Sequence, residues 1–204
     1  MSHSNAQLPE NAKEYWTHPS AKEKGDATSD VIYCAIGRAS TVWEGLEYVF
    51  VSLFCHFVEG VPSNAAARAY GAISSSKGRM EALENAAEVY FHLHQVSKEL
   101  TDEFWLVRKH FDMGRGRRND IVHAVTMEFQ FEGDSAGIFL VPAMYGSHKN
   151  FAFKPPDGDR FSMALIKYRL TSEDIIQFTI KFDHLRKAVL HFHSDFVHAH
   201  PHPE

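Results

Sequence analysis

The residues best suited to chemistry lie in one short stretch of the chain, Arg115 to Ala124, which reads Arg-Gly-Arg-Arg-Asn-Asp-Ile-Val-His-Ala. An arginine, an amide and a histidine fall within six residues there, at Arg118, Asn119 and His123. A guanidinium binds anionic groups, and an imidazole exchanges protons near neutral pH. These three residues are therefore the candidate site.

Basic residues surround this site. Positions 108 to 118 hold five lysines or arginines and one acid, Asp112. We expect Lys109, Arg115 and Arg117 to supply positive charge for a ligand, and a solvated face without a ligand is the alternative. The net charge of the whole chain is −5 with neutral histidines, which argues against a surface built for general nucleic-acid binding but allows a local basic site.

The stretch is predicted to form a short helix from about Arg117 to Val125, after Gly114 and Gly116 have weakened the helix before it. On a helix, residues four apart lie on one face. Asn119 and His123 are therefore expected to be neighbours one turn apart.

Arg118 falls instead in the middle of the apolar stripe of this helix. An unpaired buried charge costs several kcal/mol, so Arg118 needs an acidic partner. Glu47 lies at the edge of the apolar face of an earlier helix. We predict an Arg118–Glu47 ion pair between the two helices, which would serve as a structural tie, a catalytic support, or both.

Two long amphipathic helices must position the site. Apolar residues recur at alternating steps of three and four from Ile32 to Phe57, after a cap at 28–30 and before a stop at 60–62. A second such pattern runs from Ile175 to Phe196, after a hydroxyl cap and acids at 171–174. Broken helical faces over 63–97 and a further segment over 100–111 lie between them.

A strand-like insertion interrupts the helices before the last one. Alternating residues predict a strand at 126–131. The runs at 138–141 and 161–170 are further strand candidates, with a long loop over 142–160. The expected fold is mainly α: an up-down helical bundle with a small strand and loop insertion at 126–170.

Length and composition suit an ordinary globular protein, with 204 residues of which 44% are hydrophobic. We expect a flexible N-terminal arm over 1–28, one helical domain over 29–199 and a tail over 200–204. No apolar run approaches a membrane span or a secretory signal, so neither is predicted.

The only cysteines, Cys34 and Cys55, are expected to be inert core residues, and their number excludes a disulfide scaffold. A reducing, cytoplasmic location is therefore predicted. Five of the 14 histidines lie in the last 14 residues, but without acidic or thiol partners they predict adventitious metal binding. No metal site and no cofactor are expected.

The run Arg118-Asn-Asp-Ile-Val-His123, late in a helical chain, resembles the signature of the HEPN superfamily: an arginine, a polar residue and a histidine after four to six intervening residues. Counted from Arg117, five residues intervene. The resemblance covers the helical parts of the chain, about 29–126 and 171–199. It implies a metal-independent endoribonuclease that acts as a homodimer, with two motifs facing each other across a cleft.

In that interpretation His123 transfers protons, Arg118 stabilises the phosphorane-like transition state, and Asn119 orients His123 or holds a phosphate. RNA is the implied partner, with Lys109, Arg115 and Arg117 as contacts, and neither DNA nor a membrane is expected. A catalytically silent helical module that binds RNA, a nucleotide or a protein is the main alternative. A nucleotide-binding domain is a weaker one, because no glycine-rich phosphate loop is present.

Overall fold

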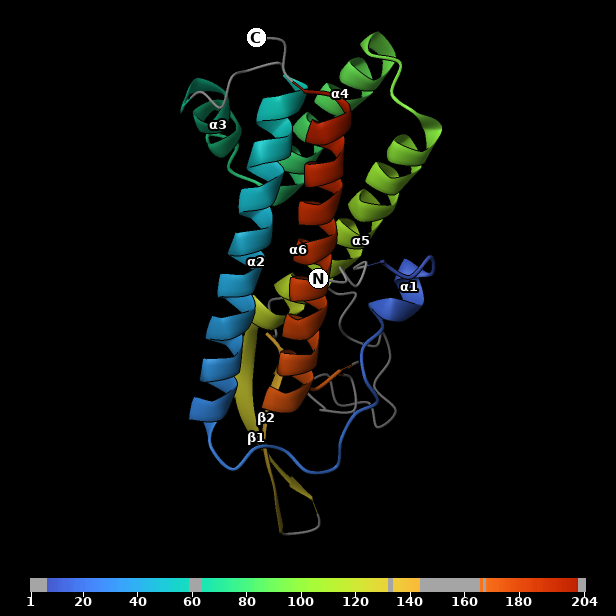
Figure 1. Cartoon of the computed structure of the whole chain (residues 1–204). Coiled ribbons are helices and arrows are strands. Elements are labelled where there is room, and N and C mark those ends of the chain that lie inside the picture. Colours follow the sequence, from blue (N-terminus) through green and yellow to red (C-terminus); the bar gives the residue numbers. More distant parts are fainter. Residues whose placement is uncertain (1–6, 59–63, 132–133, 144–165, 167, 202–204) are drawn as a thin grey trace. The chain divides into compact units, whose positions relative to one another are not determined.

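The computed structural model describes residues 7–58, 64–131, 134–143, 166 and 168–201 (Figure 1). The part described is mainly helical and carries one small antiparallel sheet before the last helix, which confirms the predicted fold class. Its elements are α1 (Ala12–Tyr15), α2 (Ser29–Phe57), α3 (Asn64–Gly71), α4 (Ser76–Leu93), α5 (Lys98–Val122), β1 (Ala124–Phe131), β2 (Asp134–Pro142) and α6 (Ser172–Ala199).

Contacts within the chain divide it into two compact units, each assembled from distant segments. The first unit comprises residues 1–12, 43–111 and 183–204, and the second comprises 13–42 and 112–182. Helices α2, α5 and α6 contribute residues to both units.

The apolar periodicity of α2 and α6 becomes the aromatic core of the first unit. Trp43 and Phe50 of α2 each lie 5.0 Å from Phe111 of α5, measured between ring centroids. Phe57 of α2 lies 5.2 Å from Phe196 of α6. All five rings are buried, so the three-four spacing correctly identified the core-facing stripe.

Helix α5 differs from its prediction in two respects. It is one continuous helix of 25 residues that runs through Gly114 and Gly116, and it ends at Val122 rather than Val125. A helical glycine costs about 1 kcal/mol, which tertiary packing of the helix can offset. The helix stops early because Val125 pairs with Val141 in the sheet.

Strands β1 and β2 pair in antiparallel register from Ala124 opposite Pro142, with an irregularity after Phe129. Phe129, Phe139 and Val141 form a small core of their own in the second unit. Of the third predicted strand, the structure describes residues 166 and 168–170; Leu170 forms a bridge with Leu140, and Ile166 is also in a bridge.

The segment predicted as a flexible arm has, over 7–28, a few side chains that are buried against the rest of the chain. Leu8, Ala12 and Trp16 are buried, and Trp16 stacks on Phe182 with ring centroids 5.6 Å apart. Within the first unit the His110 Nε2–H donates to the carbonyl of Pro9 at 2.7 Å. These contacts were not expected, because a few apolar side chains that pack on distant residues leave no periodic pattern in the sequence.

Residues 25–26 of this segment bond to β2. The Asp26 N–H donates to Ile138 at 2.9 Å, and the Ile138 N–H donates back to Asp26 at 2.8 Å. The backbone at Gly25 lies so close to β2 that a Cβ on Gly25 would be 2.6 Å from the Ile138 carbonyl oxygen. Gly137, with φ of +97°, adopts a backbone conformation that favours glycine.

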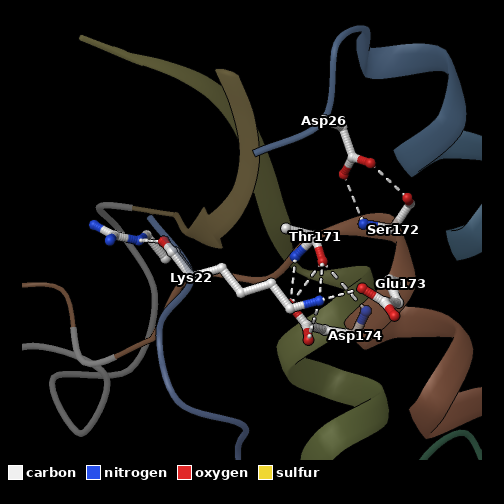
Figure 2. A network of polar contacts seen from close by, with 7 residues as sticks. Lys22, Asp26, Thr171, Ser172, Glu173 and Asp174 are labelled. Carbon is white, nitrogen blue, oxygen red and sulfur yellow. Dashed lines mark hydrogen bonds and ion pairs between the residues drawn. The ribbon is translucent and has the colours of Figure 1, made fainter. Parts of the chain in front are cut away.

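The start of α6 is held by a network of polar contacts (Figure 2). The carboxylate of Asp174 accepts from the Thr171 N–H at 2.9 Å and from its hydroxyl at 2.8 Å. Asp26 accepts from the Ser172 N–H at 2.7 Å and from its hydroxyl at 2.6 Å. The Lys22 ammonium lies 2.5 Å from Glu173 and 3.3 Å from Asp174, so the predicted cap at 171–174 also anchors residues 22–26.

No helix in the described part of the chain is long and apolar enough to cross a membrane. Cys55 is buried as expected, whereas Cys34 is exposed, because it lies on the solvent face of α2. The predicted stop at 60–62, most of the loop at 142–160, strand residues 161–165 and 167, and the ends at 1–6 and 202–204 lie outside the described residues.

Candidate active site

The candidate site lies at the C-terminal end of α5, in the second unit. His123 is the first residue after the helix, and its N–H donates to the Asn119 carbonyl at 3.1 Å. Both residues are exposed. The predicted arrangement of Asn119 and His123 one turn apart is therefore present, although the helix ends sooner than expected.

Gly116 lies on the same face of α5, three residues before Asn119 and seven before His123. A Cβ built at Gly116 would meet nothing within 4 Å. Gly116 therefore leaves the helix face beside Asn119 and His123 uncovered. A larger residue at position 116 would place its side chain there.

Arg118 is half-buried, and its Nη1 donates to the Asn119 Oδ1 at 3.3 Å. This bond orients the Asn119 amide beside the guanidinium. Arg118 and Asn119 are thus brought together as a polar pair about one turn before His123.

Glu47 is buried in the first unit, with 8% of its surface exposed. Its carboxylate lies 3.0 Å from the Arg79 Nη2 and accepts from the Trp43 Nε1–H at 3.1 Å and the Ser76 hydroxyl at 2.6 Å. Glu47 thus ties α2 to the first turn of α4. Its pairing with Arg118, a residue of the second unit, stays a prediction.

A polar cluster that sequence reasoning missed lies beside the motif, around Arg117. The Asp120 Oδ2 lies 3.2 Å from the Arg117 Nη2 and 3.2 Å from the Nε2 of His18. The His18 ring also contacts the Arg117 guanidinium and stacks on Tyr168 at 4.3 Å. His18 belongs to a segment without periodicity, so no sequence signal connected it to the motif.

Tyr168 completes this cluster. Its hydroxyl donates to the Asp120 carbonyl at 3.4 Å. The pKa of Tyr168 is raised above its usual range, mainly by burial and to a smaller extent by the negative charge of Asp120. The phenol therefore stays protonated and can donate a hydrogen bond. Arg117 and Asp120 are consequently held from both the N-terminal segment and the residues before α6.

Much of the positive charge around the motif is already paired within the chain. Arg115 lies 3.2 Å from Asp112, and in the first unit Arg108 pairs with Glu84. Lys109 is exposed. Assignment of Lys109, Arg115 and Arg117 to RNA binding stays a prediction, and the ion pairs lower the net charge that Arg115 and Arg117 present to a ligand.

Within the residues described, no group of three or more histidine, cysteine, aspartate or glutamate side chains could hold a metal ion. In the histidine-rich C-terminal region, His191 instead lies 3.4 Å from Asp195, one turn along α6. His202 lies outside the described residues.

Comparisons of the chain with models of protein families, with curated proteins and with solved structures found no match in any of the three.

Proposed function

We propose that this protein is a metal-independent endoribonuclease whose site is formed by Arg118, Asn119 and His123. The observation that carries the proposal is that His123 is exposed, one turn from Asn119, on a helix face left open by Gly116. A histidine buried and bonded within the fold would favour a silent module instead. Exposure makes the imidazole available for proton exchange with a substrate.

The proposed reaction is attack of an RNA 2′-hydroxyl on the adjacent phosphorus. The hydroxyl proton passes to a base, the bond from phosphorus to the 5′-oxygen breaks, and an acid protonates that oxygen. The products are a 2′,3′-cyclic phosphate and a 5′-hydroxyl. Arg118 neutralises the charge that builds on the phosphate oxygens, and Asn119, oriented by its bond from Arg118, holds one of those oxygens.

One histidine serves as base or acid at a given moment, so a second proton-transfer group is needed. His18 is half-buried and engaged by Arg117 and Asp120. We therefore assign the second role to His123 of another copy of this chain in a homodimer, because a two-fold arrangement places the same residue on both sides of a scissile phosphate.

The test is cleavage of mixed-sequence single-stranded RNA in excess EDTA. Wild type should cleave, and His123→Ala should reduce the rate by about 10²- to 10⁴-fold, the usual contribution of general acid–base catalysis. His92→Ala, which removes another exposed histidine on α4, is the matched control and should cleave like wild type. Equal cleavage by wild type and His123→Ala, or cleavage abolished by EDTA, would contradict the proposal.

A second candidate function is a catalytically silent binding module. The ion pairs of Arg117 with Asp120 and of Arg115 with Asp112 favour it, because paired arginines act as scaffold. This function predicts binding of a partner without cyclic-phosphate products. The cleavage assay above separates the two functions directly.

A further inference from the structure

An exposed aromatic side chain lies on α2 beside the strand that leaves the candidate site. Tyr33 is 54% exposed, although large aromatic side chains usually bury most of their surface. Its hydroxyl lies 3.0 Å from the Thr126 hydroxyl of β1, within hydrogen-bond distance. Figure 1 shows β1 beside the first turns of α2 in the second unit. The ring is thereby tethered at its tip while about half of the residue remains exposed.

The tether places this ring near His123. Thr126 follows His123 by three residues, which in an extended strand corresponds to about 10 Å along the chain. A single strand of RNA with its scissile phosphate at His123 would therefore bring a neighbouring nucleotide to the position of Tyr33.

The helix itself leaves this ring uncovered. Residue 37, one turn after Tyr33, is a glycine inside a helix of 29 residues, where glycine costs about 1 kcal/mol relative to alanine. Side chains on a helix lean towards its N-terminus, so a side chain at position 37 would lie over Tyr33. A Cβ at Gly37 would meet nothing within 4 Å, so no packing contact within the described chain accounts for the glycine.

We infer that Tyr33 is a stacking platform for an RNA base next to the scissile phosphate. The inference rests on the proposed ribonuclease function and adds a contact to an RNA base. A ring held at its hydroxyl loses little freedom when a base stacks on its face, and stacking accepts any base. The site would therefore favour unpaired RNA without strict sequence preference.

The experiment measures binding of a fluorescently labelled, mixed-sequence RNA decamer to the full chain carrying His123→Ala, so that the probe is not consumed. Adding Tyr33→Ala should weaken binding about tenfold, the usual size of one base-stacking contact. The matched control is Tyr48→Ala, which removes a tyrosine that is 74% exposed on the same helix. It should leave binding unchanged.

Two further variants separate stacking from structure. Tyr33→Phe keeps the ring and should bind within about threefold of its parent, since a stacked base contributes most of the affinity. Gly37→Gln keeps Tyr33 but covers its ring, and should weaken binding about as much as Tyr33→Ala. Circular dichroism spectra should be the same for all variants.

The outcomes distinguish this inference from the proposed function. Equal binding by the Tyr33→Ala and Tyr48→Ala proteins would overturn the stacking role and leave cleavage by wild type as evidence for the nuclease. Tyr33-dependent binding without any cleavage by wild type would overturn the nuclease and support the platform. No measurable binding of the decamer by any variant would overturn the platform.

Discussion

Two helix ends in the second unit carry polar residues of similar kinds and differ in how those residues are used. At the start of α6, Thr171, Ser172 and Asp174 bond to one another and to residues 22–26. At the end of α5, Asn119 and His123 are exposed and the adjoining turn carries Gly116. The first end is closed by its own chain. At the second, His18 and Tyr168 hold Asp120, and the exposed side chains are those of Asn119 and His123.

The contrast separates capping from chemistry. A helix terminus leaves backbone N–H or C=O groups without hydrogen-bond partners, and side chains commonly supply those partners. The hydroxyls and carboxylates at 171–174 do so and link segments 149 residues apart in the chain. A polar residue whose bonds close a helix end is accounted for by the fold, whereas an exposed one such as His123 remains a candidate for function.

Glu47 provides the largest expected effect on stability. Glu47→Ala should lower the free energy of unfolding by about 3 kcal/mol, because it leaves the partly buried Arg79 without its carboxylate partner. A double-mutant cycle measured by chemical denaturation should give a coupling of about 1–3 kcal/mol between Glu47 and Arg79. Coupling of the same size between Glu47 and Arg118 would instead show that Arg118 forms a structural ion pair, and would weaken its catalytic assignment.

Asp174 tests the closed helix end directly. Asp174→Ala should reduce stability by about 2 kcal/mol, since it removes the carboxylate that bonds back to the N-cap residue of α6 and leaves the buried Thr171 N–H without its acceptor. Glu173→Ala, at an exposed position of the same turn, should change stability by no more than about 0.5 kcal/mol.

His123 tests the end of α5 in the same way. Thermal melts should show His123→Ala to be as stable as wild type, and a large loss of stability would mean that the end of α5 is structural too.

Substitution of Gly116 should change the free energy of unfolding least, and should raise it. Gly116→Ala should stabilise the protein by about 0.5–1 kcal/mol, because the added Cβ has space and alanine is the better helix former. Gly116→Gln should gain similar stability but slow RNA cleavage by covering the face beside Asn119. If Gly116→Gln cleaves as fast as Gly116→Ala, the open turn is not part of the substrate path.

Strongly periodic segments were predictable from sequence, and isolated contacts were not. The stripes of α2 and α6 and the cap at Thr171, whose hydroxyl accepts from the Asp174 N–H, follow from local spacing, and all three are confirmed. The break predicted at Gly114 and Gly116 was wrong, because helix propensity is a weak local term that packing overrides. The one-turn spacing of Asn119 and His123 was also correct, since the last turn of a helix suffices to produce it.

By itself the sequence determined the mainly helical class, the long amphipathic helices and the position of the motif, because these depend on periods of a few residues. Only the tertiary structure decided that residues 7–28 pack, that Glu47 bonds Arg79, and that His18 and Tyr168 flank Arg117. The physical reason is that such contacts join residues up to about 150 positions apart. Their geometry depends on how separate elements pack, and no local pattern of residues records it.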